Sequence, residues 1–312
     1  METAILPSAF LDEYWRKKPL YLKNRIKANI LEQFTPESFL DWCRVTEDSV
    51  RLFQIDSKSK DGLGQSALLN NPKDAATLYP LLKKKNEQFT FLMNSVEMAD
   101  IRIRKLRDDF QIPYILRVDD IIATLSTPDS GIGFHAGHED GFIVQLYGSR
   151  NWKVWSPSLT SNEYRYELLH PTTSKPPMEK PDGNEHLLID VVTSPGDILY
   201  IPPFFPHDGV TIEESLSLNM AWRGLAPISF LKHISSVRHE YIDTLKAITL
   251  FEDIQPHRLI PKYWVSDTLN SVHTTNMNPL IEVEANEIIS SYIQIQVENY
   301  LSNQVTEEEN AQ

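Results

Sequence analysis

Two histidines and two carboxylates fall close together in the stretch "GIGFHAGHEDGFIVQLYGSRNW", residues 131–152. They are His135, His138, Glu139 and Asp140. Imidazole and carboxylate side chains are common ligands of zinc and of non-haem iron. A His-x-x-His pair on a helix would put both rings on one face, but the H-E-x-x-H and H-x-x-E-H patterns of zinc hydrolases are absent. The stretch therefore indicates a metal site that is not of the helical zinc-hydrolase type.

The elements that carry these side chains are predicted to be strands. Several glycines argue against a helix through the histidines, because glycine is a poor helix former. The residues that follow alternate between apolar and polar side chains, as a strand does. We therefore expect the two histidines on a loop or at the entry of a strand, at the mouth of a barrel. The residues on which this rests are Gly131, Gly133, Gly137, Gly141, Phe142, Val144 and Leu146.

A third histidine lies in a second stretch with strand signals, "SPGDILYIPPFFPHDGV", residues 194–210. Pro195-Gly196-Asp197 is typical of a turn, "ILYI" of a buried strand, and "PPFFP" of a stiff bend. His207 follows where the chain re-enters the sheet. A single histidine there would more often be structural, but His207 paired with His135 in one barrel favours a metal site.

The rest of the chain places these stretches in a mainly β protein with helices at both ends. "PSAFLDEYWRKKPLYLKN" predicts a short helix that ends near Pro19 and then a strand. "TPESFLDWCRV" predicts a helix with Thr35 as N-cap and Pro36 in its first position. From about residue 49 the pattern turns to strands, and after Pro227 helical spacing returns, with a further helix near 284–303. The strand segments are "SVRLFQI", "QFTFLMNSV", "YILRVDDIIATLST", "FIVQLYG", "NWKVWSP", "HLLIDVVTSPGDILYIPP" and "SLSLNMAWRG".

Composition excludes several classes of function. The net charge of −13 disfavours nucleic acid as a partner, since the molecule repels phosphate backbones. Cys43 is the single cysteine, which excludes an internal disulfide, and its amphipathic context predicts a buried thiol. The N-terminal sequence lacks signal-peptide character, and no stretch approaches 18 uninterrupted apolar residues. We therefore expect a cytoplasmic protein with no membrane partner.

Five ordered motifs resemble one known family. "FLDEYWRKKPLYLKN", "ILRVDDIIATLSTPDSGIGFH", "FIVQLYGSRNWKVWSP", "PGDILYIPPFFPH" and "SLSLNMAWRG" are similar to signatures of the jumonji-C (cupin-like) iron(II)/2-oxoglutarate oxygenases. The resemblance is nearest to the branch that hydroxylates ribosomal proteins, and it covers about residues 7–226. It implies a double-stranded β-helix (jelly-roll) core in a domain spanning 1–225, followed by a helical C-terminal region, 226–312.

The same resemblance implies a set of site residues and cofactors. Iron(II) would be held by His135 and His207. Arg150 would bind the far carboxylate of 2-oxoglutarate, for which its planar fork is suited. Asn219 is the matching polar residue near this cosubstrate. The implied reaction consumes dioxygen and 2-oxoglutarate and hydroxylates an aliphatic C–H bond.

The chain departs from the family at the third iron ligand. The family motif is His-x-Asp/Glu, and the carboxylate position here is Gly137, which offers iron no donor. Glu139, Asp140 or His138 could complete the ligand set instead, or the two histidines and 2-oxoglutarate could suffice. A structural role is the favoured interpretation for Asp140. Iron(II)/2-oxoglutarate halogenases of another branch carry glycine or alanine at this position and bind chloride there. A non-catalytic cupin-like binding module is the third alternative.

We predict a hydroxylase, because the frame of the whole chain resembles protein hydroxylases rather than halogenases. The family favours a protein or peptide side chain as substrate. The C-terminal helices carry apolar stripes that a lone helix cannot bury, so we expect them to cap the barrel or to form a homodimer interface.

Overall fold

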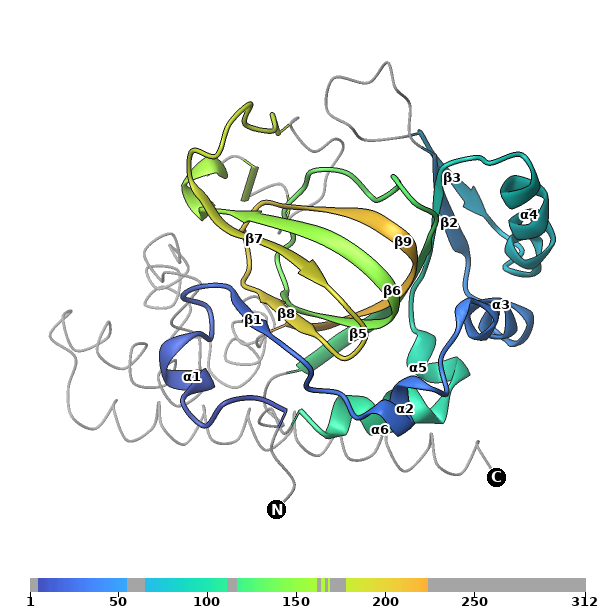
Figure 1. Ribbon diagram of the computed structural model, residues 1–312, viewed down its shortest axis with the longest axis horizontal. Coiled ribbons are helices and arrows are strands. Elements are labelled where there is room, and N and C mark those ends of the chain that lie inside the picture. The colour runs from blue at the N-terminus through green and yellow to red at the C-terminus, as the bar shows by residue number, and fades with distance from the viewer. Residues whose placement is uncertain are drawn as a thin grey trace, which may run out of the picture. The chain divides into compact units, whose positions relative to one another are not determined.

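The computed structural model describes residues 5–54, 65–110, 117–161, 164–165, 168 and 178–223. The compact unit that carries the predicted site is built from residues 1–110 and 118–222 (Figure 1). The predicted domain boundary near 225 and the helical region 226–312, expected to cap the barrel or to form a homodimer interface, lie outside the described residues and stay predictions. Within the described ranges, no helix is both long and apolar enough to span a lipid bilayer.

Helices flank the strands in this unit (Figure 1). The helices are α1 (Phe10–Glu13), α2 (Ala28–Leu31), α3 (Pro36–Val45), α4 (Lys73–Lys84), α5 (Val96–Ala99), α6 (Ile101–Asp108) and the 3₁₀ turn η1 (Pro157–Leu159). The strands are β1 (Leu20–Leu22), β2 (Val50–Gln54), β3 (Gln65–Leu69), β4 (Phe89–Met93), β5 (Arg117–Ser126), β6 (Asp140–Trp155), β7 (Leu187–Thr193), β8 (Ile198–Ile201) and β9 (His207–Arg223).

Strand β6 organises the sheet. Along one edge it pairs with β9 over nearly its whole length. Along the other edge it pairs first with β8 and then with β7, and every pairing of β6 is antiparallel. The strand order is β1-β8-β6-β9-β5-β4-β2-β3, with β7 beside β6. Because β6 and β9 serve both halves of the sheet, they link the two halves of the predicted jelly roll.

Both long strands bend as they pass from one half to the other (Figure 1). The β6–β9 register shifts between Gln145 and Tyr147, between Tyr147 and Ser149, and again before Arg150. Such bulges add twist and let a sheet curl on itself. Apolar side chains fill the enclosed space, so the double-stranded β-helix has a packed core. They include Ile143, Trp152, Val154, Leu199, Ile201 and Phe205.

Most local elements agree with the sequence prediction. Helix α3 begins at Pro36 with Thr35 as N-cap, and a capping box with Ser38 completes its first turn. Cys43 is fully buried, as predicted, and desolvation raises the pKa of its thiol to about 12. The two segments predicted as separate strands before and after Gly148 are one continuous strand, β6.

Helix α4 was not predicted, because the chain was expected to be strand-rich from residue 49. Pro80 lies inside this helix, where proline removes a backbone donor. Tertiary contacts compensate: the Tyr79 ring meets the Phe89 ring edge-on at 6.0 Å, and Tyr79 is hydrogen-bonded to Glu214. Helix α4 therefore depends on packing against the sheet as well as on its own sequence.

Candidate iron centre

The two predicted iron ligands stand side by side. His207 is the first residue of β9, and His135 lies in the loop before β6. Their backbones form an isolated antiparallel bridge, with N–H···O distances of 3.1 Å from His135 to His207 and 2.8 Å in return. Their ring centroids are 4.3 Å apart. The structure thus brings together two imidazoles that are far apart in the sequence.

Both rings are oriented by the same kind of hydrogen bond. Nδ1 of His135 lies 2.8 Å from the carbonyl oxygen of Gly133, and Nδ1 of His207 lies 2.9 Å from that of Phe205. A carbonyl only accepts, so each Nδ1 carries the proton and each Nε2 carries the lone pair that a metal requires. Desolvation, together with the neighbouring His135, lowers the pKa of His207 to about 3. The His207 ring is therefore neutral at physiological pH, as a metal ligand must be.

A further backbone hydrogen bond connects the loops on which the two histidines lie. Phe204 donates its N–H to the carbonyl oxygen of Gly137 over 2.8 Å, so Gly137 lies beside the bend that precedes His207. Among the described residues, no group of three or more His, Cys, Asp or Glu side chains is arranged to hold a metal ion. The histidine pair is therefore formed, and the third donor is not yet in place.

Glu139 folds back towards Gly137. A Cβ atom built on Gly137 would lie 3.1 Å from Oε2 of Glu139. His138 contacts both oxygens of this carboxylate: its backbone N–H donates to Oε2 over 3.1 Å, and its Nε2 lies 3.0 Å from Oε1. A carboxylate thus lies next to the glycine that replaces the expected ligand.

Asp140 points into a buried polar cluster. Its Oδ2 accepts from Nε of Arg16 over 2.7 Å, and its Oδ1 accepts from the hydroxyl of Tyr200 over 2.7 Å. The Asp140 side chain is completely buried, and desolvation raises its pKa while Arg16 and Tyr200 oppose that shift. Both carboxylate oxygens are thus engaged in packing α1 against the sheet. The structural role favoured for Asp140 agrees with these contacts, whereas direct ligation does not.

Arg150 is a buried cation held by neutral groups. Its Nη2 donates to the carbonyl oxygen of Gly209 over 3.0 Å, and its Nη1 donates to Oγ1 of Thr124 over 3.2 Å. Nε has no hydrogen-bond partner within the part of the chain that the structure describes, and the side chain is 1% exposed. Desolvation lowers the pKa of Arg150 to about 10, although the negative charge of Asp208 opposes this shift, so the guanidinium still carries its charge at neutral pH. A buried charge needs a counter-ion, so this geometry suits an anionic ligand.

The curvature of β9 builds the surroundings of Arg150. Nη2 of Arg150 contacts Gly209, and Nη1 lies 3.5 Å from Oγ of Ser217. Gly209 and Ser217 are eight positions apart, a separation that would span about 26 Å in an extended strand. The Trp152 ring lies under the guanidinium at 4.9 Å. A Cβ on Gly209 would come within 2.6 Å of the Trp152 ring, so glycine is required for this close approach. Sequence analysis did not identify Thr124, Gly209 or Ser217, since their role depends on the bend.

Asn219, the other predicted cosubstrate residue, lies on β9 opposite Ile143 of β6. Its Oδ1 is buried and has no hydrogen-bond partner among the described residues. That oxygen lies 3.0 Å from the position of a Cβ on Gly141. An unpaired buried acceptor calls for an explanation, and a bound polar ligand would provide one.

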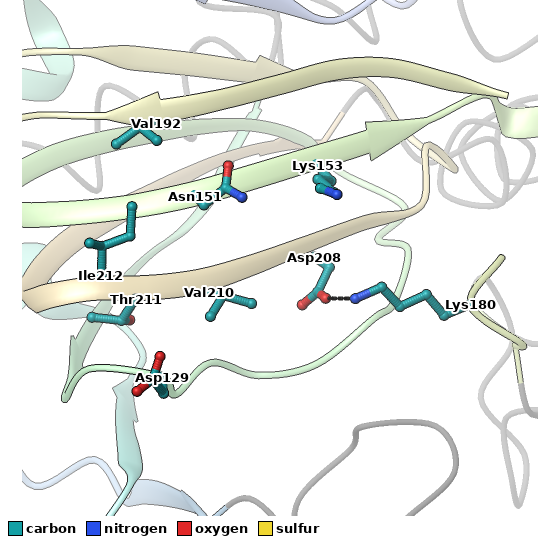
Figure 2. Close-up of a pocket in the computed structure, with 9 residues that line it drawn as sticks. All are labelled: Asp129, Asn151, Lys153, Lys180, Val192, Asp208, Val210, Thr211 and Ile212. Atoms are coloured by element: carbon teal, nitrogen blue, oxygen red, sulfur yellow. Dashed lines mark hydrogen bonds and ion pairs between the residues drawn. The ribbon is translucent and has the colours of Figure 1, made fainter. Parts of the chain in front are cut away.

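A surface hollow of about 450 Å³ is lined by residues of β6, β7 and β9, among them Asn151, Val192 and Asp208 (Figure 2). Asp208, Val210 and Ile212 alternate with His207 and Gly209 along β9, so their side chains point to the outer face. Figure 2 shows Asp208 in an ion pair with Lys180, near Lys153 and Asn151 of β6. This hollow is therefore separate from the histidine pair.

Comparison with known proteins agrees with the resemblance expected from the sequence. Residues 105–226 match the family model described as the JmjC domain. The chain is 29% identical over 219 residues to a probable ribosomal oxygenase of Haemophilus influenzae, covering 70% of this chain and 50% of that protein. It is 28% identical over 215 residues to the ribosomal protein uL16 3-hydroxylase of Escherichia coli, covering 69% of this chain and 52% of that protein. The chain thus spans about half the length of these curated relatives.

Solved structures agree on the fold. An X-ray structure of E. coli YcfD superposes with a TM-score of 0.57 at 21% identity, covering 85% of this chain and 72% of that one. YcfD in complex with cobalt and 2-oxoglutarate, described as a ribosomal oxygenase, gives a TM-score of 0.53 at 21% identity over 82% of this chain and 69% of that one. Residues 105–226 thus match a JmjC domain model, the fold is the jelly roll of the solved structures, and the similar proteins include ribosomal oxygenases.

Proposed function

We propose that this chain is an iron(II)- and 2-oxoglutarate-dependent oxygenase that hydroxylates an aliphatic C–H bond in a protein or peptide side chain. The observation that carries the proposal is the fully buried Arg150 cation, which lies in the same barrel as the histidine pair and is held by neutral acceptors. Desolvation outweighs the opposing charge of Asp208, so an anionic cosubstrate would further stabilise this buried cation.

The residues present fit the metal and cosubstrate that the JmjC family uses. His135 and His207 would hold iron(II) through Nε2, because their Nδ1 protons are bonded to carbonyl oxygens. Arg150 would bind the far carboxylate of 2-oxoglutarate with charge-assisted hydrogen bonds, assisted by the hydroxyl of Thr124. Asn219 would contribute a polar contact near the cosubstrate.

The protein's contribution to the reaction is binding and orientation. When bound, iron and 2-oxoglutarate supply the power to oxidise a C–H bond with dioxygen. The backbone bridge between His135 and His207 fixes the distance between the two rings. Trp152 packs against both the Arg150 guanidinium and the His207 ring, at 4.9 and 6.1 Å, so an apolar ring lies beside both groups. Apolar surroundings would strengthen each electrostatic contact with the anionic cosubstrate.

The substrate class comes from the relatives. Two curated proteins of similar sequence are named as a ribosomal oxygenase and a ribosomal protein hydroxylase. A basic ribosomal protein would also suit a chain whose net charge is −13. A ribosomal substrate and the single cysteine are consistent with action in the cytoplasm.

The halogenase alternative is less well supported by the geometry. A halide at the position of Gly137 would meet the carboxylate of Glu139, which lies 3.1 Å from the Cβ position there. Two anions at that separation repel each other. A non-catalytic binding module would keep the same fold and the same Arg150. Only a measurement of 2-oxoglutarate turnover distinguishes that alternative from the oxygenase.

The test is reconstitution of the full chain with iron(II) under anaerobic conditions, followed by dioxygen, 2-oxoglutarate and a mixture of ribosomal proteins. We expect succinate to form, and mass spectrometry should find one added oxygen atom in one of the proteins. The His207→Ala variant should form neither product, since it lacks one ligand. Binding of metal and 2-oxoglutarate without any succinate would favour the binding module.

A further inference from the structure

The third iron ligand is the part of the proposed centre that the structure leaves open. This inference rests on the proposed function, because it concerns how the same metal would be held. Iron(II) in non-haem oxygenases takes two histidines and one carboxylate on one face, with the remaining positions open for substrates. The chain has the two histidines, and Gly137 stands where a carboxylate is expected. Either another side chain supplies the anionic ligand to iron(II), or water occupies that coordination position.

Three nearby side chains compete for this role. Asp140 is excluded by its contacts, since Arg16 and Tyr200 each hold one of its oxygens in a buried cluster. His138 is turned towards Glu139, with Nε2 3.0 Å from Oε1. Glu139 is the remaining carboxylate, and its Oε2 lies 3.1 Å from the position that a Cβ of residue 137 would take.

We propose that Glu139 supplies the carboxylate ligand in place of residue 137, and that His138 positions it. The missing side chain of Gly137 leaves the space that the longer side chain of Glu139 enters. An aspartate at 137 would place its own Cβ 3.1 Å from Oε2 of Glu139, so the two carboxylates would compete for one place. The glycine at 137 therefore makes room for the Glu139 carboxylate.

His138 gives this carboxylate a defined orientation. Its backbone N–H bonds Oε2 and its ring nitrogen contacts Oε1, so one residue addresses both oxygens. Glu139 and His138 are 23% and 22% exposed, so the pair is partly shielded from water. Hydrogen-bonded partners of this kind orient metal-binding carboxylates and raise metal affinity. His138 is thus a positioning residue, not a ligand.

The proposed ligand set requires a side-chain rotation on metal binding. In the described residues Glu139 does not yet form a three-donor group with the histidines. Glutamate has one more rotatable bond than aspartate, so Oε2 can turn from Gly137 towards a metal on the two imidazoles while Oε1 keeps its contact with His138. A divalent metal with two neutral imidazoles attracts this nearby anion strongly.

Cobalt(II) titration of the full-length protein, followed by the visible absorption of the bound ion, tests the proposal without turnover. Four variants are compared with the parent: Glu139→Gln, His138→Ala, Gly137→Asp and the double variant Gly137→Asp/Glu139→Gln. Glu32→Gln is the matched control, because Glu32 is an exposed glutamate on another element. Urea unfolding confirms that each variant is folded.

We expect Glu139→Gln to weaken cobalt binding by about tenfold or more, and His138→Ala to weaken it by a smaller factor. The double variant should bind cobalt about as tightly as the parent, since an aspartate at 137 restores a carboxylate. Parental affinity in Glu139→Gln would overturn the role of Glu139, even if the protein binds iron and 2-oxoglutarate. A parent protein that binds no cobalt at all would instead contradict the proposed function itself.

Discussion

Arg16 and Asp140 form a buried ion pair, with Nε of Arg16 2.7 Å from Oδ2 of Asp140 and side-chain exposures of 6% and 0%. Tyr200 joins them, since its hydroxyl donates to Asp140 and accepts from the backbone N–H of Arg16, each over 2.7 Å. This cluster fixes the chain after α1 to the start of β6 and to β8. Both carboxylate oxygens of Asp140, the residue next to Glu139, are therefore engaged in this cluster.

The Asp140→Ala variant should therefore lose stability rather than metal affinity. The substitution takes the Asp140 carboxylate away from the buried Arg16 guanidinium, and breaking a buried ion pair costs about 3–5 kcal/mol of the free energy of unfolding. Urea unfolding measures this cost, and Glu32→Ala, an exposed control, should change stability by less than about 0.5 kcal/mol. Weak cobalt binding at parental stability would show that Asp140 is a ligand after all.

The His135→Ala and His207→Ala variants should each lose iron(II) or cobalt(II) binding. Each substitution removes one of two neutral nitrogen donors but keeps the backbone bridge, so the fold should persist. Calorimetric titration measures the loss. His186→Asn is a suitable control, because His186 is exposed and has a positive φ of 62°, which asparagine tolerates. Full metal affinity in His207→Ala would refute the proposed centre.

The Arg150→Ala variant should weaken 2-oxoglutarate binding much more than metal binding. Hydrogen bonds to a charged partner contribute about 1.5–3 kcal/mol, so the loss should be about tenfold or more. Lys153→Ala is the matched control, since Lys153 is a cation on the same strand whose side chain points to the outer face (Figure 2). An unchanged Kd for 2-oxoglutarate would assign its far carboxylate to another residue.

Halide should not perturb the absorption band of the iron(II)·2-oxoglutarate complex in the parent protein. The reason is the negative charge of Glu139 beside Gly137. Glu139→Ala removes this charge and should gain a saturable response to chloride or bromide. Gly137→Asp/Glu139→Ala should lose the response again. A saturable response in the parent, abolished by Gly137→Asp alone, would support the halogenase alternative.

Glu97 should make the stability of the protein depend on pH. Desolvation, with a contribution from Asp120, raises the pKa of Glu97 from 4.5 to about 7. The folded state therefore binds this proton more tightly than the unfolded chain does. The stabilisation that comes from this bound proton is complete below pH 4.5. It is lost as the pH rises to about 7, and the free energy of unfolding falls by up to about 3 kcal/mol.

Urea unfolding of Glu97→Gln at pH 5 and pH 8 tests this dependence on pH. The amide does not titrate, so the fall in unfolding free energy over this window should be smaller in Glu97→Gln than in the parent. The Glu32→Gln control should keep the parental slope. Equal slopes in Glu97→Gln and the parent would mean that Glu97 titrates alike in the folded and unfolded states.

The sequence by itself predicted most of the local elements and suggested the residues of the proposed site. Thr35 and Pro36 define the start of α3, because capping and the fixed φ of proline act within one turn. Alternation in "FIVQLYG" and "NWKVWSP" identifies strand residues, although not that they form one strand. His135, His207 and Arg150 were identified through ordered motifs, and the structure places the two histidines together and Arg150 in a buried position.

Only the tertiary structure decided which way each side chain points and what it meets. Asp140 and Glu139 are adjacent in sequence, yet one joins a buried cluster with Arg16 and the other lies over Gly137. Gly209 and Ser217 reach one guanidinium because bulges bend β6 and β9 together. In a strand, neighbouring side chains point to opposite faces of the sheet. Which face meets a metal or a cluster depends on contacts with distant segments, and these exist only once the sheet has closed.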